Sequence, residues 1–242
     1  MLVYDNGLLY MHRYWLFEQE VARHLCLLWQ SALPFDDQSL SQKLKHHFNS
    51  QLDDIDYQKQ AVAVCQMSRL GIITGGPGTG KTTTVTKLMA IFIELFLECR
   101  GRLPRIDLVA PTGKAASRML SSIQFAKKQL DVGDSVLQAI PAVAKTLHRL
   151  LGVRHLELEF KHNNSNKLHS DLIILDEASM VDLPMMYRLL QAVKADAKLI
   201  LIGDPFQLAS VEVGCLLGDI IDTNRINHYS PQVAERLNQI EG

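Results

Sequence analysis

The sequence has little that would place the protein in a membrane or in a disulfide-stabilised scaffold. Its 242 residues include only four cysteines, at positions 26, 65, 99 and 215, and none of them is spaced as C-x-x-C. This spacing argues against a zinc site and against a disulfide framework. No run approaches the roughly 18 consecutive apolar residues that a membrane span requires. The first residues also lack the basic and apolar regions of a signal peptide. We therefore expect a cytoplasmic protein with reduced thiols.

An excess of charge of either sign is also missing, because the formal net charge is −1. This balance predicts no sequence-wide attraction to nucleic acid or to a membrane surface, so any contact with DNA would depend on local groups. Apolar residues make up 47% of the chain, which is enough to fill the core of one large domain or of one domain with an appendage.

What the chain does have is a glycine-rich octapeptide. Residues 75–82 read GGPGTGKT and match the phosphate-loop pattern G-x-x-x-x-G-K-[ST] at every specified position. Glycines let successive main-chain N–H groups point into one concavity, Lys81 adds a positive charge, and Thr82 offers a hydroxyl to Mg²⁺. The residues expected to bind ATP at this loop are Gly75, Gly76, Pro77, Gly78, Thr79, Gly80, Lys81, Thr82 and Thr83.

The flanking sequence supports this interpretation over a glycine-rich turn that fits the pattern by chance. The apolar run 71–74 is typical of a buried parallel strand. After Lys81, apolar residues at spacings of three and four predict one helical face, formed by Val85, Leu88, Met89, Phe92 and Phe96. The loop would then lie between a strand and a helix N-terminus, whose dipole favours phosphate.

Two further strands end in polar residues suited to the same ligand. The apolar run 172–175 is followed by Asp176 and Glu177. Asp176 is placed to hold Mg²⁺, and Glu177 to orient and deprotonate the water that attacks the γ-phosphate. The run 199–202 leads into Gly-Asp and a turn that presents Gln207, whose amide suits a sensor of the γ-phosphate. Taken alone, that turn would be read as a polar cap of the next helix.

The order of these segments predicts the fold class and the domain organisation. Strand candidates at 71–74, 106–110, 172–175 and 198–202 alternate with helices, so we expect an α/β domain over residues 57–222, with a parallel sheet covered on both faces. Residues 1–56 should form a hairpin around Asn6-Gly7, a helix and a linker. Whether this element packs on the α/β domain stays open. Residues 223–242 are expected to be a polar tail, the start of a region missing from a longer protein.

Several residues outside the phosphate loop have both a ligand-binding and an ordinary explanation. Thr112 and Lys114 follow a strand and begin a helix, where they could hold a phosphate of a nucleic-acid backbone. Thr146 and His148 offer a hydroxyl and an imidazole, which could hold a phosphate or stack on a base, although a plain helix surface is the commoner reason for such residues. Gln58 carries an amide able to pair with adenine, or simply begins a helix.

These segments together resemble superfamily 1 DNA helicases and, among them, the RecD family. The resemblance rests on Gln58 and on the strings GGPGTGKTTT, APTGKAA, TLHRLL, DEASMVDLPMM and GDPFQLASVE, in the order expected for that family. It implies a P-loop NTPase with a RecA-like domain, a 5′-to-3′ motor on single-stranded DNA, and assembly with RecB-like and RecC-like subunits into a helicase-nuclease for double-strand breaks.

The resemblance also implies a role for each matched residue. Gln58 would bind adenine, Lys81 would act with Asp176, Glu177 and Gln207 in hydrolysis, and Thr82 with Asp176 would hold Mg²⁺. Thr112, Lys114, Thr146 and His148 would lie along the DNA strand. Superfamily 1 motors place ATP between two RecA-like domains, and no second one is recognisable here, so this segment should bind nucleotide and hydrolyse it poorly. The rival hypotheses are a P-loop kinase or other non-helicase ATPase, and a nucleotide-binding module that only docks onto partners.

Overall fold

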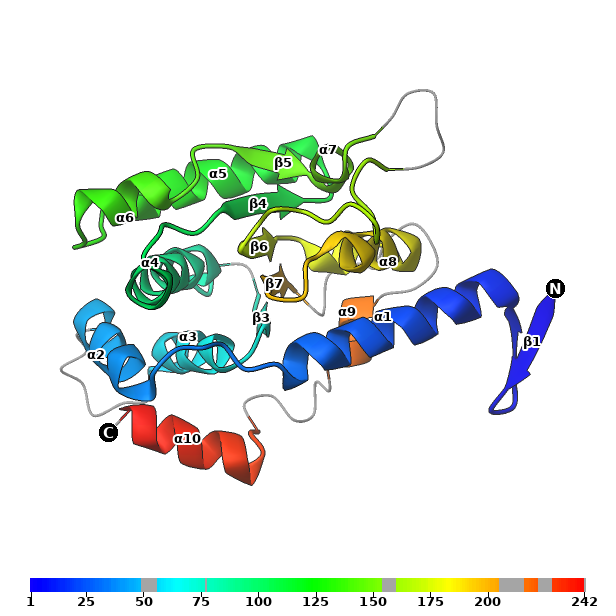
Figure 1. Cartoon of the computed structure of the whole chain (residues 1–242), viewed down its shortest axis with the longest axis horizontal. Coiled ribbons are helices and arrows are strands. Elements are labelled where there is room, and N and C mark those ends of the chain that lie inside the picture. The colour runs from blue at the N-terminus through cyan, green and yellow to red at the C-terminus, as the bar shows by residue number, and fades with distance from the viewer. Residues whose placement is uncertain (49–55, 77, 154–159, 205–215, 222–227, 242) are drawn as a thin grey trace.

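In the computed structural model, a five-stranded parallel sheet forms the centre of the molecule (Figure 1). The structure describes residues 1–48, 56–76, 78–153, 160–204, 216–221 and 228–241. The strands lie in the order β3-β7-β6-β4-β5, and each adjacent pair is parallel. Their bounds are β3 Leu70–Thr74, β4 Ile106–Ala110, β5 Ala144–Thr146, β6 Leu172–Leu175 and β7 Lys198–Gly203.

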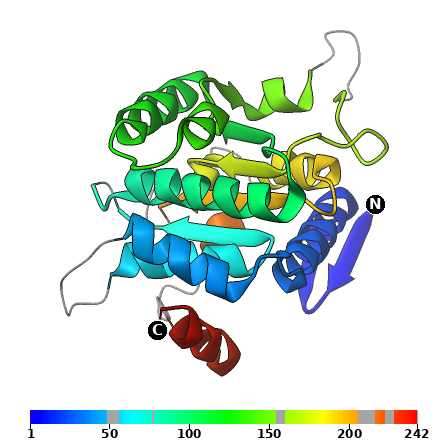
Figure 2. The same ribbon diagram turned by 60° about the vertical axis from the view of Figure 1, so that its left-hand side comes forward.

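Helices cover both faces of this sheet, as the sequence predicts. On one face pack α2 (Asp37–His47), α3 (Tyr57–Met67), α4 (Lys81–Arg100), α5 (Gly113–Lys127) and α6 (Asp134–Ala139). On the other lie α1 (His12–Gln30), α7 (Leu147–Leu151), α8 (Leu183–Ala192) and α9 (Leu216–Ile220). Figure 2 shows α4 running across its face of the sheet. The α/β class with helices on both faces is therefore confirmed.

Strand β6 shows why the sheet needs two helical layers. Its four residues are all fully buried. Leu172 and Ile174 belong to the core on the α4 side, whereas Ile173 and Leu175 belong to the core on the α8 side. Alternate side chains of a strand point to opposite faces, so a strand that is apolar at every position must be covered twice.

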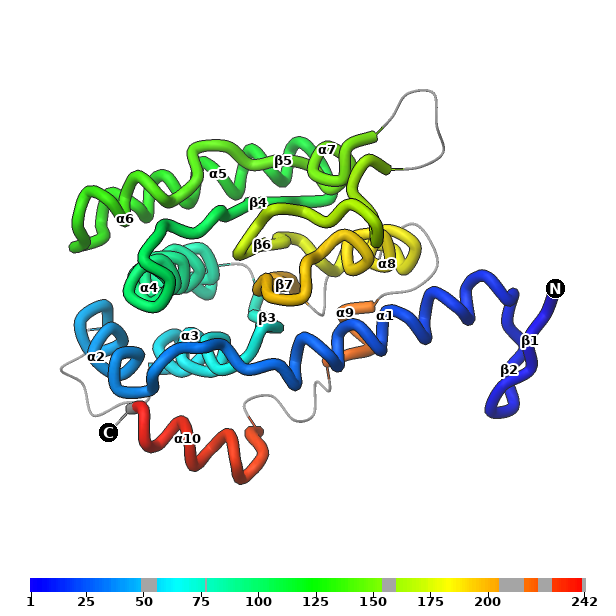
Figure 3. The backbone as a smooth tube through the Cα atoms, viewed as in Figure 1, coloured from blue at the N-terminus to red at the C-terminus, as the bar shows by residue number. Residues whose placement is uncertain are grey.

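The N-terminal element packs on this domain, which settles the question left open by the sequence. Strands β1 (Leu2–Asp5) and β2 (Leu8–Met11) form the expected antiparallel hairpin, with Asn6 and Gly7 at φ 48° and 83°. Figure 3 shows this hairpin at the outer end of α1. Helix α1 buries Phe17, whose ring lies 4.6 Å from that of Tyr187 on α8. Helix α1 is thus packed directly on the α/β domain.

Two elements differ from the sequence prediction. Strand β5 is absent from that prediction, because only three residues form it and its pattern is not apolar; it pairs with β4 at the edge of the sheet. Residues 231–241, which the sequence analysis places in a polar tail, form helix α10 (Pro231–Glu241). Leu237 and Ile240 of this helix enter the same core as α3 and α4, and Arg236 pairs with Asp37 of α2.

No helix in the described ranges combines the length and the apolar character needed to cross a bilayer.

Candidate functional site

Apart from Gln58, the predicted site residues that the structure describes end or follow strands of one parallel sheet, so they lie toward the same edge. The segments that follow β3, β7, β6 and β4 leave from their carboxyl ends, which is where open α/β sheets bind ligands. The phosphate loop follows β3, Asp204 follows β7, Asp176 follows β6 and Thr112 follows β4. The N–H of Asp176 donates to the carbonyl of Val109 in β4, which fixes the acid against its neighbour strand.

Left-handed glycines shape the phosphate loop. Gly78 and Gly80 have φ of 78° and 81°, a region that side chains with a Cβ rarely adopt. Gly80 is also crowded, since a Cβ there would lie 2.5 Å from the Nε2 of Gln58. That amide donates to the carbonyl of Thr79 at 3.4 Å. Gln58 therefore lies against the loop, as its proposed role requires.

Helix α4 begins at the loop with its main-chain donors uncapped. Its N-cap residue, Gly80, makes no side-chain cap, as is also true of α1 and α6, whereas Asp56, Thr112, Thr146 and Asp182 cap α3, α5, α7 and α8. The first turn of any helix leaves N–H groups without intrahelical partners. At α4 these donors, with the positive end of the helix dipole, are left for an anion.

Some side chains at the start of α4 already donate hydrogen bonds within the protein, and others are available to a ligand. The Lys81 ammonium donates to the loop carbonyls of Gly75 and, at 2.8 Å, of Gly76. Thr84 and Thr86 donate their hydroxyls back along the helix, at 3.1 and 2.8 Å. The Thr82 hydroxyl has no hydrogen-bond partner among the described residues. The hydroxyl of the neighbouring, exposed Thr83 also has none among these residues, so Thr82 and Thr83 both offer a hydroxyl at this helix start.

Asp176 and Glu177 form a half-buried acid pair. Glu177 adopts a left-handed conformation with φ 52°, and its N–H donates to Asp176 Oδ1 at 2.9 Å. Burial raises the pKa of Asp176, against the Glu177 hydrogen bond and the positive charges of Lys81 and Arg118. Burial and the adjacent Asp176 raise the pKa of Glu177, against the same two cations. Carboxyl groups with raised pKa values are typical of catalytic sites.

Arg118 was missed by the sequence interpretation. It lies on α5, four residues after Lys114, so the two side chains share one helical face. Its charge acts on both acids, together with that of Lys81. The spacing from Lys114 was the available signal.

The oxygen donors fit a magnesium ion. Mg²⁺ binds through one or two carboxylates and hydroxyls together with phosphate oxygens and water. Asp176 and the free Thr82 hydroxyl would be its protein ligands, and the metal would supply charge neutralisation for the phosphates when bound. The donor set contains neither thiol nor imidazole, which agrees with a hard cation.

The residues predicted to contact DNA lie near this edge, but two of their hydroxyls are engaged. Thr112 accepts from the Ala115 N–H at 3.2 Å, and Thr146 accepts from the Arg149 N–H at 3.3 Å, so both act as helix N-caps. Lys114 and His148 are exposed. The His148 ring lies 6.0 Å from that of Phe160. Gln207 and Pro77 lie outside the described residues.

Comparison with known proteins identifies a family and several relatives. Residues 58–213 match the AAA domain family. The RecBCD enzyme subunit RecD of Haemophilus influenzae is 44% identical over 225 residues, which is 90% of this chain and 34% of that protein. RecD of Mycolicibacterium smegmatis is 43% identical over 218 residues, 90% of this chain and 38% of that protein. The ATP-dependent RecD2 DNA helicase of Deinococcus radiodurans is 36% identical over 159 residues, 65% of this chain and 19% of that protein.

The chain spans about a third of the length of the curated RecD relatives it matches. Because the family match covers more than half of its residues, the chain belongs to the AAA domain family, with RecD subunits of the RecBCD enzyme among its relatives.

Proposed function

We propose that this chain is the ATP-binding part of a DNA helicase motor, a subunit that moves 5′-to-3′ on single-stranded DNA within a helicase-nuclease that processes double-strand breaks in recombinational repair. The observation that carries the proposal is the meeting of the phosphate loop and the acid pair at one sheet edge, where the charge of Lys81 reaches both Asp176 and Glu177. The names of the RecD and RecD2 relatives support the helicase class.

Each side chain of the site has a specific role in this proposal. Lys81 and the N–H groups of α4 bind the phosphates, and Gln58 selects adenine. Thr82 and Asp176 hold Mg²⁺. Glu177 takes a proton from the attacking water, and its raised pKa makes it a better base than an exposed carboxylate. Gln207 reports the γ-phosphate to the DNA-binding residues.

The DNA strand would cross the carboxyl edge of β4 and β5. Lys114 and His148 are exposed there and offer a charge for phosphate and a ring for stacking. Thr112 and Thr146 contribute mainly by fixing the starts of α5 and α7, since their hydroxyls accept from main-chain N–H groups. RecB-like and RecC-like subunits are the proposed partners.

Single-stranded DNA stimulation of ATP hydrolysis, measured on the full-length gene product, tests the motor. A helicase should hydrolyse ATP many times faster with the strand present, and Glu177→Gln should abolish turnover while ATP still binds. If a phosphate acceptor stimulated turnover instead of DNA, the protein would be a kinase-like P-loop enzyme.

The variant Lys81→Ala, studied in the assembled complex, distinguishes the helicase motor from a module that binds nucleotide only to dock onto partners. Loss of unwinding with normal assembly supports the motor. Normal assembly and normal unwinding would show that the nucleotide serves docking alone and would overturn the proposal.

A further inference from the structure

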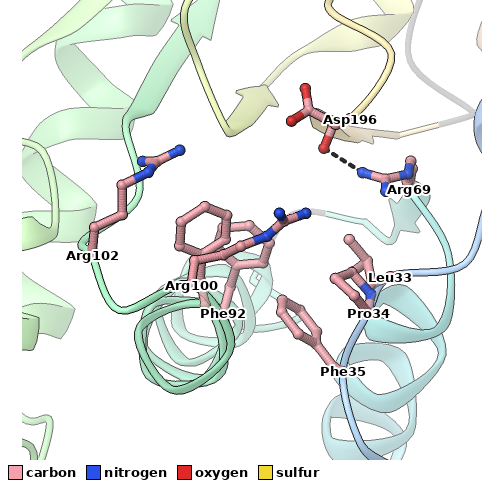
Figure 4. Close-up of a pocket in the computed structure, with 9 residues that line it drawn as sticks. Leu33, Pro34, Phe35, Arg69, Phe92, Arg100, Arg102 and Asp196 are labelled. Carbon is pink, nitrogen blue, oxygen red and sulfur yellow. Dashed lines mark hydrogen bonds between the residues drawn. The ribbon is translucent and has the colours of Figure 1, made fainter.

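A pocket of about 260 Å³ opens at the amino-terminal edge of the sheet, away from the phosphate loop. Arginines and aromatic rings dominate its lining (Figure 4). The lining residues are Leu33, Pro34, Phe35, Arg69, Phe92, Phe96, Arg100, Arg102 and Asp196. Asp196 is the one acidic residue among the described residues that line it.

The pocket is distinct from the nucleotide site described above. Lys81 and Arg100 are the first and last residues of α4, which has 20 residues. At a rise of about 1.5 Å per residue, the two ends of this helix lie about 30 Å apart. One bound nucleotide cannot contact both.

The arginines of the pocket differ in how far they are satisfied. Both Nη atoms of Arg102 already donate to the carboxylate of Asp171, at 2.8 and 2.9 Å. Arg69 donates one Nη to the main-chain carbonyl of Asp196 and keeps its other donors. Arg100 has no hydrogen-bond or ion-pair partner within the described parts of the chain. Figure 4 shows Arg100 reaching into the space between Arg102 and Arg69.

The charges around the pocket do not balance. Four cations, Arg69, Arg100, Arg102 and Lys194, face two carboxylates, Asp171 and Asp196. Two positive charges are therefore uncompensated among the described residues, which suits a dianion. The C-terminal end of α4 carries only about half a negative charge from its dipole, so it opposes an anion less than the guanidinium groups attract one.

The floor of the pocket is aromatic. The rings of Phe92 and Phe96 lie 5.6 Å apart and Phe35 meets Phe92 edge-on at 5.7 Å. The guanidinium of Arg102 lies 4.9 Å from the centre of the Phe96 ring. Phe92 is 1% exposed, so the apolar surface open to a ligand belongs to Phe96 and Phe35. Aromatic side chains pack favourably against another ring, and arginine is the side chain whose planar fork matches phosphate oxygens.

An ordinary explanation covers part of this arrangement. An arginine in the last turn of a helix is favoured by the dipole, which accounts for Arg100 alone. It does not account for the convergence of Arg69 and Arg102 on the same space from the connections that precede β3 and β4, nor for the aromatic floor.

We propose that this pocket binds a phosphate monoester attached to a planar ring, the chemistry of a mononucleotide. The phosphate would bind between Arg100 and Arg69, and the ring would pack against Phe96 and Phe35. The volume suits a phosphate with one ring system and lies just below the usual range of about 300–1,000 Å³ for small-molecule sites. A free nucleoside monophosphate and the phosphorylated end of a DNA strand present this same chemistry.

Phenyl phosphate is the simplest probe, and calorimetry on the purified chain is the measurement. Arg100→Gln should weaken its binding about tenfold or more, since one charge-assisted contact is lost. The matched control is Arg105→Gln, which removes an exposed arginine next to the pocket that does not line it; its affinity should stay within about twofold of the unaltered chain. Equal affinity in the Arg100→Gln chain, or no binding of phenyl phosphate, would overturn the proposal.

Two further probes test the chemistry. Benzoate has the ring with a single negative charge and should bind several-fold more weakly, and inorganic phosphate lacks the ring and should do the same. If either matched phenyl phosphate, the dianion or the ring would be unnecessary and the proposal would fail.

Displacement of phenyl phosphate then identifies the source of the ligand. Displacement by AMP indicates a free nucleotide, and displacement by a 5′-phosphorylated but not a 5′-hydroxyl oligonucleotide indicates a strand end. Displacement by neither contradicts the mononucleotide assignment. Lys81→Ala should leave phenyl phosphate binding unchanged while it weakens ATP binding, so failure of this inference is distinct from failure of the proposed function.

Discussion

Gly80 has two separate reasons to lack a side chain. Its φ of 81° is costly for any residue with a Cβ, and a Cβ would also lie 2.5 Å from Gln58 Nε2. The same helix ends at Gly101, with φ 66°, where a Cβ would have no neighbouring atom within 4 Å. The two glycines that flank α4 therefore share a left-handed backbone, which would strain any residue with a Cβ, but differ in their surroundings.

Substitution by alanine at these two positions distinguishes the effect of backbone strain on stability from the effect of loop geometry on ATP affinity. Gly80→Ala should weaken ATP binding at least about tenfold, because it displaces Gln58 and the loop together. Gly101→Ala should lower the free energy of unfolding by about 1 kcal/mol and leave ATP affinity unchanged. Calorimetric titration with ATP and chemical denaturation measure the two quantities. Equal ATP affinities in both variants would contradict the proposed loop geometry.

Lys198 predicts a pH dependence of stability. Its ammonium is fully buried and donates to the carbonyls of Cys65 and, at 2.6 Å, of Ser68, near the end of α3. Burial lowers the pKa of Lys198 from 10.5 to about 7. A neutral amine has two N–H groups and can still donate to both carbonyls.

The direction in which stability changes with pH follows from the number of protons bound in the folded and unfolded chains. Between pH 7 and 9 the unfolded chain holds a proton on Lys198 that the folded chain lacks, so the free energy of unfolding rises with pH, by at most about 1.4 kcal/mol per pH unit. Above pH 9 the buried Cys65 thiol, whose pKa burial raises from 9.0 to about 11, opposes this trend. Denaturation at pH 7, 8 and 9 should show the rise in the unaltered chain and a flatter dependence in Lys198→Met. A parallel dependence in both chains would refute the assignment to Lys198.

At the scale of elements, α10 is held by an apolar contact and an ion pair, which contribute unequally to the free energy of unfolding. Leu237 is 4% exposed in the main core, whereas the Arg236 and Asp37 side chains are 34% and 41% exposed. Leu237→Ala should therefore cost about 2–4 kcal/mol of stability, and Arg236→Ala less than about 1 kcal/mol. Chemical denaturation of the two variants checks this order. A larger loss for Arg236→Ala would mean that the ion pair, not the core contact, holds the helix.

Elements with strong local patterns could be predicted, and those fixed by distant contacts could not. The Asn6-Gly7 turn, the apolar β6 run and the phosphate loop each contain the chemistry that determines their shape. The three residues of β5 contain no such pattern, because their strand exists only through pairing with β4. Helix α10 resembles a polar tail in the sequence, because its few apolar residues become significant only against the surface formed by α2 and α3.

The same distinction holds for the site. Lys81, Asp176 and Glu177 could be assigned from motif and order, and the parallel sheet brings their segments to one edge. The capping roles of Thr112 and Thr146 depend on main-chain geometry that a motif does not specify. Lys198 gave no signal of burial, since a lysine before an apolar strand is usually exposed.

For the whole molecule, the two edges of the sheet have different tasks, and β6 carries an acid at each. Asp176 follows the strand at the carboxyl edge, where burial raises its pKa. Asp171 precedes the strand and is 3% exposed. Burial opposes its charge, but Arg102, the Arg105 N–H and Lys194 outweigh burial and hold the pKa of Asp171 well below its usual range. One edge thus holds an acid whose pKa is raised, and the other fixes an acid in an ion-pair network.

Asp171→Asn should therefore destabilise the fold and spare the site. Breaking a buried pair costs several kcal/mol, and because Arg102 is half-exposed we expect about 2–4 kcal/mol. The matched control is Asp107→Asn, whose carboxylate is 20% exposed and pairs with Lys145, and which should cost about 1 kcal/mol. Chemical denaturation at neutral pH measures both losses. ATP affinity, titrated where each variant is folded, should not change, because five residues of strand separate Asp171 from Asp176 by roughly 16 Å.

The loss at Asp171 should also depend on pH in a defined direction. Since the folded pKa of Asp171 is lowered, the carboxylate contributes fully above its ordinary pKa of 3.8, and its contribution falls as the pH drops toward the folded value. The difference in stability between the unaltered chain and Asp171→Asn should be constant from pH 5 to 7 and shrink below about pH 4. A difference that stayed constant below pH 4 would show that Asp171 acts through packing, and a fall in ATP affinity at neutral pH would show that the two edges are coupled. The expected pattern, lost stability with intact nucleotide binding, is what separate tasks at the two ends of one strand require.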